Sequence, residues 1–403
     1  MRYDLRPLLS GKVLGLICVL AAGPLQDSDR KDPGMTVASS WSKLPNLPAK
    51  HNWGYGASLW KGDQLYLFHY QQETELPSIT AFDPKAKKWT FLPEAPQEGA
   101  GRGRMTIPPP PVAVLEERAY FPRQNLSFDF KARKWQKLPK APVVCQHAVS
   151  AGNRVYACGF EGEDFKSRFS AAVYDPEKNS WELLAERRLE VPFQAQGLAW
   201  TGRKALIWGT RPPAIDKARG DAAPLGCLLD AVAYDPERKV WETPTGMPHQ
   251  DDQSRRIDGS VWTGDRIIYL GEAVHGVKGA CRNDGLIYDL AAGTWTSIPP
   301  APLKGRSGSA LAWTGKKLVV WSGVPCSGCE GRKRSCSDGA AFDPASGEWA
   351  GIPDAPIPGM FPPCVAWAGD RIIVYGGYGD RFVRAGETAW YVWPGAKEQP
   401  KKE

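Results

Sequence analysis

The sequence predicts an all-β fold: a seven-bladed β-propeller of four-stranded antiparallel blades, closed by the N-terminal strand pairing with the last blade. The first observation is composition, since the 403 residues include 42 Gly, 36 Pro and 17 Trp, which is typical of many short strands joined by turns. The second is an aromatic-Asp-to-Trp pattern that recurs six times. The third is the phase of the repeats, which places one strand before the first complete unit.

The recurring pattern begins with Phe or Tyr followed by Asp, and in each copy a Trp stands six residues after the Asp. An Asp at the start of a turn can accept hydrogen bonds from the backbone ahead of it, and a neighbouring Pro sets φ for the next position. Each copy therefore predicts a hairpin with the aromatic residue and the Trp on its two strands. The copies are residues 82–89, 128–135, 174–181, 234–241, 288–295 and 342–349.

Another hairpin, with an apolar second strand, precedes each of these units. In most copies its turn contains Gly, which adopts positive φ at little cost. The seven copies are residues 58–68, 114–121, 148–158, 198–208, 260–270, 311–321 and 365–375. A third element, Trp-x-x-Leu/Ile-Pro, ends the unit in most copies, because Pro can end a strand without leaving an unpaired donor.

The order of the strands predicts a closed ring. Strands that carry the repeat Trp occur seven times, from Trp41 to Trp349, at a mean spacing of about 51 residues, within the range of propeller repeats. After the seventh first hairpin only a third strand remains, at 388–395, so residues 39–45 are predicted to be its missing fourth strand. Such closure leaves only short sheet edges.

At these residues the chain resembles the kelch-repeat β-propellers, from about Trp41 to Pro394. The Gly-Gly doublet that ends the second strand of a kelch blade is Gly376-Gly377 here, and elsewhere one glycine of it remains, in Cys158-Gly159, Trp208-Gly209, Leu270-Gly271 and Ser322-Gly323. The resemblance implies function at the mouth of a central channel. Most of the repeat Trp and Tyr side chains are then expected to pack between blades.

The amino end predicts export. Arg2, Arg6 and Lys12 precede an uncharged apolar run at 13–23, which is typical of a signal peptide and shorter than the roughly 20 residues that span a bilayer. We expect a signal peptide at about 1–26, a linker at 27–38, the kelch-like propeller at 39–395 and a disordered tail at 396–403. The expected location is therefore secreted or periplasmic, without a membrane span.

Eight cysteines follow the expected signal peptide, an even number that fits up to four disulfides in an oxidising compartment. If Ala151-Gly152 is a two-residue turn, Cys145 faces Cys158, and we predict a disulfide between them. The other pairings stay open, among Cys227, Cys281, Cys326, Cys329, Cys336 and Cys364. Because no His lies near Cys326-x-x-Cys329, a disulfide is favoured there over a metal site, and no metal or other cofactor is expected.

Candidate ligand-binding residues come from the connections that enter each blade, which can line the channel mouth in kelch-like proteins. They are His51, Trp53, Arg104, Gln146, Gln194, Arg256 and Arg306. The three arginines could converge on a carboxylate or another anion. The alternative, left open, is that they are solvated or pair with Glu98, Asp251, Asp252 and Asp258.

Catalytic motifs are absent from the sequence. The five histidines form no His-x-x-x-His pair, and neither a Gly-x-Ser-x-Gly elbow nor a Gly-rich phosphate loop is present. We therefore expect a secreted, monomeric binding or scaffold protein whose partner is a protein or a glycan, and an anionic partner would suit the arginines. The alternative is an enzyme of mutarotase or epimerase type on anionic sugars, with Asp258 transferring the proton. The diffuse positive charge argues against nucleic acid.

Overall fold

The computed structural model describes residues 40–48, 56–71, 76–96, 110–161, 168–184, 194–211, 228–250, 256–272, 283–325, 335–360, 363–377 and 386–393. The expected signal peptide, linker and tail lie outside these residues. So do four of the cysteines whose pairing was left open: Cys227, Cys281, Cys326 and Cys329.

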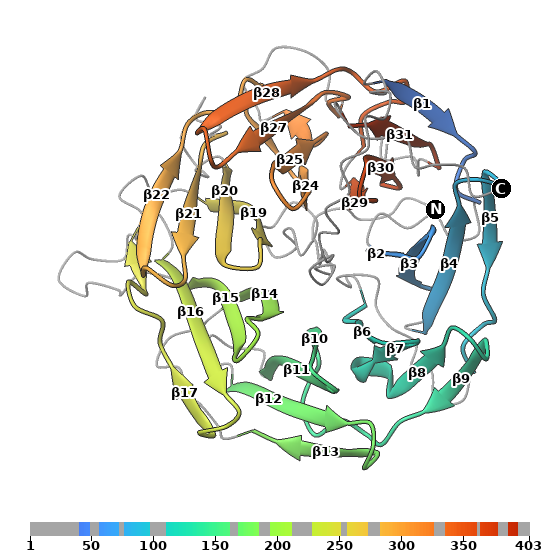
Figure 1. Cartoon of the computed structure of the whole chain (residues 1–403), viewed down its shortest axis with the longest axis vertical. Helices are drawn as coiled ribbons and strands as arrows, with labels where there is room; N and C mark the ends of the chain where they lie inside the picture. The colour runs from blue at the N-terminus through green and yellow to red at the C-terminus, as the bar shows by residue number, and fades with distance from the viewer. Residues whose placement is uncertain are drawn as a thin grey trace, which may run out of the picture.

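Seven blades, each an antiparallel sheet, stand around a common centre, as the sequence predicts (Figure 1). Blade 1 comprises β2 (Ala57–Lys61), β3 (Gln64–Tyr70), β4 (Pro77–Asp83) and β5 (Lys88–Phe91). Blade 2 comprises β6 (Ala113–Leu115), β7 (Arg118–Phe121), β8 (Leu126–Asp129) and β9 (Lys134–Lys137). Blade 3 comprises β10 (His147–Ala151), β11 (Arg154–Glu161), β12 (Arg168–Asp175) and β13 (Ser180–Leu183).

The remaining blades follow the same order from the centre outward. Blade 4 comprises β14 (Gln194–Trp200), β15 (Ala205–Arg211), β16 (Leu228–Asp235) and β17 (Val240–Glu242), and β18 (His249–Gln250) also pairs with β16. Blade 5 comprises β19 (Arg256–Trp262), β20 (Arg266–Glu272), β21 (Gly285–Asp289) and β22 (Thr294–Ile298). Blade 6 comprises β24 (Ala310–Trp313), β25 (Leu318–Trp321), β27 (Gly339–Asp343) and β28 (Glu348–Ile352).

Blade 7 joins the two ends of the chain, which confirms the predicted closure. It comprises β29 (Cys364–Trp367), β30 (Arg371–Tyr375), β31 (Thr388–Val392) and, as its outer strand, β1 (Trp41–Leu44). Ser42 lies opposite Trp390 in the antiparallel β1–β31 pair. The N-terminal strand therefore completes the last blade (Figure 1).

Alternating strand directions give the ring two different faces. On the face that we call the turn face, tight turns join the first strand to the second and the third to the fourth. The opposite face, the loop face, carries the connections between second and third strands and those between blades. In blades 4, 5 and 6 the former are long, spanning residues 212–227, 273–284 and 322–338.

The repeat Asp makes the turn that the sequence predicts. Oδ1 of Asp83 accepts hydrogen bonds from the backbone N–H groups of Lys85 and Ala86, at 2.8 and 3.0 Å. Five further Asp residues accept equivalent bonds, namely Asp129, Asp175, Asp235, Asp289 and Asp343. In these five, backbone hydrogen bonds are the main cause that lowers the carboxyl pKa, because they stabilise the charged form.

The first hairpin of blade 3 has a different register from the predicted one. Ala151 pairs with Arg154, so Gly152 and Asn153 form the turn rather than Ala151 and Gly152. Gly152 has a φ of +58°, which a turn of this kind needs at its first position and which Ala adopts poorly. As a result Cys158 faces His147.

Because of this register, the structure does not form the predicted Cys145–Cys158 disulfide, and neither cysteine takes part in another one. Cys145 packs with Ala157 and Ala172, whereas Cys158 packs with Phe169 in another cluster. Adjacent residues of a strand point to opposite sides of the sheet, so Ala157 and Cys158 mark the two sides. The two sulfurs therefore lie on opposite sides of the blade.

An aromatic pair joins the third and fourth strands of every blade. In blade 2, Phe128 lies opposite Trp135 with ring centroids 5.0 Å apart. The corresponding pairs have centroids 4.6 to 5.2 Å apart, in Phe82–Trp89, Tyr174–Trp181, Tyr234–Trp241, Tyr288–Trp295, Phe342–Trp349 and Tyr391–Trp41. Each such cross-strand pair contributes about 0.2–1 kcal/mol of stability.

The same tryptophans also link neighbouring blades. Nε1 of Trp135 donates a hydrogen bond to the carbonyl oxygen of Pro93, which stands four residues after the Trp of blade 1. Four further bonds of 2.7 to 3.0 Å follow this rule: Trp41 to Pro353, Trp89 to Pro45, Trp181 to Pro139 and Trp349 to Pro299. The Pro of the Trp-x-x-Leu/Ile-Pro element thus supplies the acceptor for the next blade.

Blade 4 lacks this Pro, and the link shifts by one residue. Nε1 of Trp295 donates to the carbonyl of Gly246 at 3.1 Å, while the hydroxyl of Tyr288 donates to the carbonyl of Thr245 at 2.6 Å. Between the blades, buried apolar side chains fill the remaining space. At the closure, for example, Leu65 of blade 1 packs with Ile373 of blade 7.

We predict that Trp135→Phe lowers the free energy of unfolding by about 1–2 kcal/mol, because it removes the N–H that bonds Pro93 while keeping a ring in the aromatic pair. Trp200→Phe is the matched control, since the Trp200 indole stacks on Tyr156 and makes no hydrogen bond to another described residue. Chemical denaturation of both variants measures the difference. Equal losses in the two variants would show that the inter-blade bond contributes nothing.

Candidate functional site

Only some of the residues predicted to line the channel mouth have a described position or side chain. His51, Trp53 and Arg104 lie outside the described residues. Gln194 and Arg256 begin the innermost strands β14 and β19, so their backbones stand at the loop face, while their side chains are not among the described ones. Asp258, proposed for proton transfer, is in the same situation on β19. The side chains of Gln146 and Arg306 are among the described ones.

Arg306 is a buried, fully engaged side chain. It lies on β23 (Arg306–Ser307), which pairs with β26 (Val324–Pro325) at the loop end of blade 6, and only 4% of it is exposed. Its Nη1 and Nη2 donate to Oδ1 and Oδ2 of Asp338, at 2.6 and 3.0 Å. Its Nε donates to the carbonyl of Lys304 at 2.9 Å. This fork-to-fork pair is the strongest ion pair geometry available to arginine.

The electrostatics of Asp338 follow from this pair. Partial burial raises the pKa of the Asp338 carboxyl, but the hydrogen bonds and positive charge of Arg306 outweigh burial, and the pKa lies below its ordinary value. An anion that approached Arg306 would have to displace a carboxylate already held by two bonds. Arg306 therefore acts within the protein as a structural residue, and its partner is none of the acids considered from the sequence.

A serine network fixes the chain beside this pair. The hydroxyl of Ser309 donates to the carbonyl of Ser322 at 3.1 Å, and the hydroxyl of Ser322 accepts from the N–H of Met360 at 2.9 Å. Ser322 and Gly323 take positive φ values of 61° and 102°. A side chain at Gly323 would come within 2.7 Å of the Ser309 oxygen, so glycine is required. The degenerate kelch doublet Ser322-Gly323 thus has a structural role.

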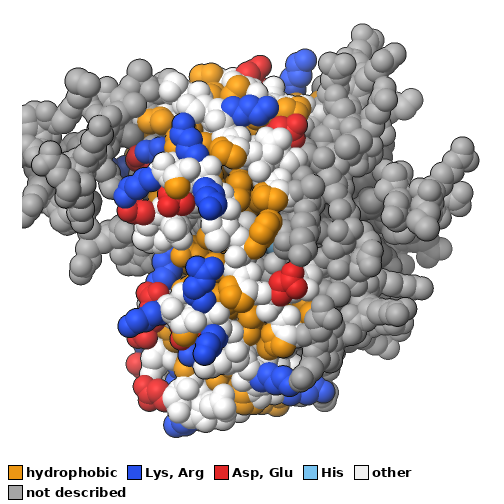
Figure 2. Space-filling model, turned by 90° about the vertical axis from the view of Figure 1, so that its right-hand side faces the viewer, with side chains coloured by type: hydrophobic (Ala, Val, Ile, Leu, Met, Phe, Trp, Pro, Cys, Tyr) orange, Lys and Arg blue, Asp and Glu red, His pale blue; other side chains and the backbone are white. Residues whose placement is uncertain are grey.

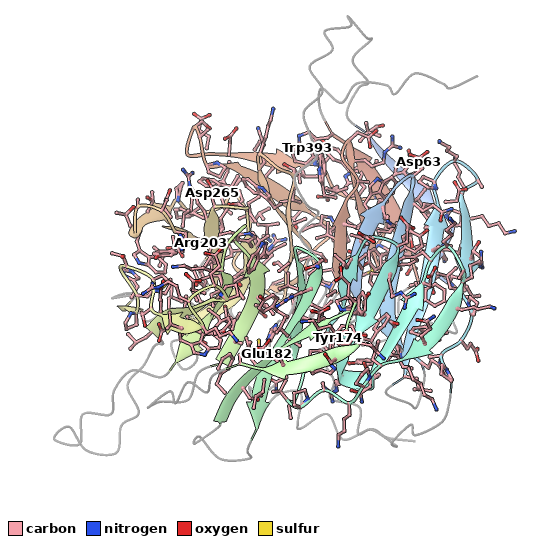
Figure 3. The ribbon with its side chains drawn as sticks, turned by 60° about the horizontal axis from the view of Figure 1, so that its bottom comes forward. Asp63, Tyr174, Glu182, Arg203, Asp265 and Trp393 are labelled. Atoms are coloured by element: carbon pink, nitrogen blue, oxygen red, sulfur yellow. The ribbon has the colours of Figure 1, made fainter. Side chains whose placement is uncertain are left out.

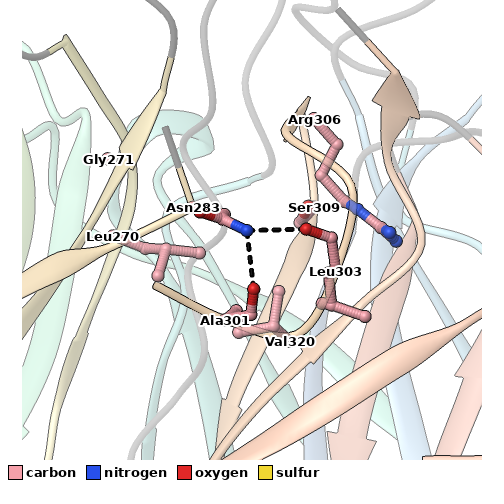
Figure 4. Close-up of a pocket in the computed structure, with 8 residues that line it drawn as sticks. All are labelled: Leu270, Gly271, Asn283, Ala301, Leu303, Arg306, Ser309 and Val320. Atoms are coloured by element: carbon pink, nitrogen blue, oxygen red, sulfur yellow. Dashed lines mark hydrogen bonds between the residues drawn. The ribbon is translucent and has the colours of Figure 1, made fainter. Parts of the chain in front are cut away.

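The cavity beside Arg306 is too small for an organic ligand. It is lined by Leu270, Gly271, Asn283, Ala301, Leu303, Arg306, Ser309 and Val320 (Figure 4), and its volume of ≈ 10 Å³ suffices for one water molecule at most. Nδ2 of Asn283 closes it by donating to the carbonyls of Ala301 and Leu303, both at 2.6 Å. Side chains fill this part of the loop face, so it has no room for a substrate.

Gln146 and His147 enter blade 3 at the loop face. The backbone N–H of Gln146 bonds the carbonyl of Cys158 at 2.8 Å, and its side chain is half-buried. Burial lowers the pKa of His147 to about 4, although a hydrogen bond to the backbone of Ala195 in blade 4 opposes the shift. His147 is therefore neutral at pH 7 and links two blades, and it is not poised to exchange protons near neutral pH.

The described residues offer little for metal or thiol chemistry. Burial raises the pKa of the Cys145 thiol to about 12 and that of Cys364 to about 11, so both are protonated at neutral pH and unreactive as nucleophiles. Within the same residues no three His, Cys, Asp or Glu side chains form a group that could hold a metal ion. None of their helices is long and apolar enough to cross a bilayer.

A larger cleft, of ≈ 290 Å³, opens at the turn face between blades 4 and 5. It is lined by Thr201, Lys204, Leu206, Ala233, Glu242, Thr243, Pro244, Thr245 and Leu290. The chain leaves the sheet after Glu242, the last residue of β17, and Thr243, Pro244 and Thr245 form part of the lining. Its two charged groups, Lys204 and Glu242, are bonded to each other.

No family model matches the sequence. The human Kelch repeat and BTB domain-containing protein 13 is 28% identical to the chain over 182 residues. That match covers 43% of this chain and 37% of the human protein, so the chain spans little more than a third of the length of this relative. The name of this relative describes kelch repeats, and the six copies of the hairpin pattern and the seven four-stranded blades agree with that description. The chain is a seven-bladed β-propeller with kelch-like repeats.

The solved structure of YjhT is also similar to this kelch propeller. It is 15% identical, with a TM-score of 0.46, over 86% of this chain and 95% of that chain.

Sequence reasoning missed Asp338 as the partner of Arg306. The two residues are separated by a long connection, and only the pairing of β23 with β26 brings them together. The sequence feature that could have pointed to this pair is Ser322-Gly323, in which Ser replaces the first glycine of the kelch doublet. Both residues take positive φ, and hydrogen bonds from nearby polar side chains stabilise the chain there.

We predict that Asp338→Asn destabilises the kelch propeller by about 2 kcal/mol at pH 7, less than for a fully buried pair because the Asp338 side chain is 37% exposed. Since the folded pKa lies below the ordinary 3.8, the charge of Asp338 stabilises the fold above pH 4. That contribution is lost as the pH falls through the folded pKa. The difference between wild type and variant, measured by thermal unfolding, should therefore be constant from about pH 7 to 5 and shrink below 4. A difference that vanished by pH 6 would contradict this assignment.

Proposed function

We propose that this kelch propeller is an exported scaffold that binds another protein through its loop face. A kelch-type fold by itself suggests a protein-binding or scaffold role. The observation that carries the proposal is the contrast between the two faces. Tight Asx and glycine turns occupy the turn face, whereas the connections between second and third strands at the loop face span 16 residues in blade 4 (212–227) and 17 in blade 6 (322–338).

Export is supported by the amino-terminal sequence and by the cysteines of the loop-face connections. Cys227, Cys281, Cys326 and Cys329 all belong to the connections of blades 4, 5 and 6. Disulfides there would order long segments before binding and so reduce the entropy lost on association. A rigid ring that presents such segments suits recognition of a protein surface, and a glycan is the second candidate partner.

An enzyme that acts on anionic sugars receives less support. Of the three arginines proposed for its mouth, only Arg306 has a described side chain, and that guanidinium is committed to Asp338. The cavity beside it does not hold a sugar. The enzyme stays the alternative that the experiment must test, because the side chains of Arg104, Arg256 and Asp258 are not among the described ones.

We predict that the full-length protein, immobilised, retains a protein from the extracellular or periplasmic fraction of its source, and that calorimetry with the purified partner gives a defined stoichiometry. Replacing 213–226 by a short Gly-Ser linker should weaken this binding at least tenfold. The control, Lys316→Glu at the turn face of blade 6, should leave it unchanged.

Glycan binding and anomerisation of sialic acid are measured in parallel with the same preparations. Turnover of the sugar that Asp258→Ala abolishes, together with no retained protein, would overturn the scaffold proposal in favour of an enzyme. Protein binding that is insensitive to every change on the loop face would place the interface elsewhere.

A further inference from the structure

The outer hairpins of the blades share one backbone but differ in charge. From the turn Asp to the end of the fourth strand, blade 1 (83–91) has three lysines against one Asp, and blade 2 (129–137) has four cations against one Asp. In blades 3 to 6 the acids outnumber the bases, in 175–183, 235–242, 289–298 and 343–352. We call the outer hairpins of blades 1 and 2 the cationic rim. Figure 2 looks onto this flank, where Lys and Arg side chains spread over the surface.

Five cations of the rim are exposed and form no ion pair with a described residue: Lys87, Lys88, Lys131, Arg133 and Lys134. The cations in the outer hairpins of blades 3 and 4 are paired. Lys178 lies 3.8 Å from Asp175, and Lys239 lies 3.1 Å from Glu182 of the neighbouring blade, which Figure 3 labels. Among the described residues, the positive charge of the rim is therefore not balanced by ion pairs as it is in blades 3 and 4.

Two of these cations occupy backbone positions that disfavour them. Lys87 and Arg133, four residues after the turn Asp, have φ values of 50° and 53°. At the same position blades 5 and 6 have Gly293 and Gly347, with φ values of 67° and 74°. A residue with a side chain is strained there and glycine is not. Both rim blades thus have a cation where the turn alone would favour glycine, as blade 4 has in Lys239, whose φ is 56°.

Protection of sheet edges does not explain the rim. Lysines on an edge strand can prevent unwanted strand pairing, and β5 and β9 are edge strands that pair only inward among the described residues. However, β22 and β28 are equally edge strands of this ring and contain no Lys or Arg. Blades of this protein therefore do not need cations on their outer strands.

The free edges indicate which polyanion the rim fits. An extended peptide can pair its backbone with an edge strand while its alternate side chains reach the cations, whereas a membrane or a sulfated polysaccharide can use the charge alone. Phe91, 42% exposed at the end of β5, adds an apolar contact that also suits a peptide.

We propose that the cationic rim of blades 1 and 2 docks an extended acidic segment of a protein partner, with β5 or β9 as the strand that it joins. The inference rests on the proposed scaffold function and adds the chemistry of the partner and a second contact surface, at the outer edge rather than the loop face. Carboxylates of the segment take the place that local acids take in blades 3 and 4.

The experiment uses the full-length protein and a fluorescent peptide of about eight residues with alternating Glu and Thr, at low ionic strength. The variant Lys87→Gly/Arg133→Gly removes two rim cations and relieves the backbone strain, so its melting temperature should equal or exceed that of wild type. Its affinity for the peptide, measured by anisotropy, should fall about tenfold. Lys239→Gly, the same substitution at the same turn position of blade 4, should leave the affinity unchanged.

Binding should also weaken as salt is added, because the contact is between exposed charges. Equal affinities of wild type and the double variant would overturn the proposal, as would tighter, rim-dependent binding to phosphatidylserine vesicles or to heparin than to the peptide. Self-association that depends on the rim cations, measured by light scattering, would also overturn it, because the rim would then bind a second copy of this protein. A partner that the loop face retains equally well in the double variant would overturn the rim contact while leaving the scaffold function intact.

Discussion

In blades 1, 2, 3, 5, 6 and 7 the described residues show a tryptophan that holds the blade to the preceding one by two contacts at once. Its ring pairs with the aromatic residue opposite it on the third strand, and its N–H bonds a carbonyl of the blade before. The first contact fixes the orientation of the indole, and the second uses that orientation. A hairpin that could stand alone only marginally thereby becomes part of a ring.

The start of the chain takes part in this series of contacts twice. Trp41 donates to Pro353 of blade 6, and Pro45 accepts from Trp89 of blade 1. The five residues 41–45 therefore connect blades 6, 7 and 1, besides supplying the outer strand of blade 7. Without them the ring would have an open edge and an acceptor and a donor without partners, which is why the order of the repeats begins with a fourth strand.

Because the link uses only the Trp, its aromatic partner and one carbonyl, the outward positions of each blade are free to vary. Outer hairpins of identical geometry carry a net positive charge in blades 1 and 2 and a net negative charge in blades 3 to 6. The loop face varies in another way, since Arg306 and Asp338 anchor blade 6 there by an ion pair where a kelch doublet would rely on two glycines. Scaffold and surface are thus separate parts of the same repeat.

Periodic features were accessible from sequence, and single contacts were not. The Asp-to-Trp spacing predicted the blades, the turns and the closure at Trp41, because each repeat tests the assignment again. The register of the blade 3 hairpin depended on one turn residue, and shifting the turn from Ala151 to Gly152 moved Cys158 opposite His147. The bond between Arg306 and Asp338 depends on how one irregular connection returns, for which no repeat provides a comparison.

Hydrogen exchange of the indole N–H groups, followed by NMR of the ¹⁵N-labelled protein after transfer to D₂O, tests the inter-blade link most directly. The six N–H groups that bond a neighbouring blade, in half-buried side chains, should exchange only when blades separate, and far more slowly than those of Trp200 and Trp313. If all of them exchanged at the rate of these two, the tryptophans would be filling space between blades without joining them, and the account of the ring would be wrong.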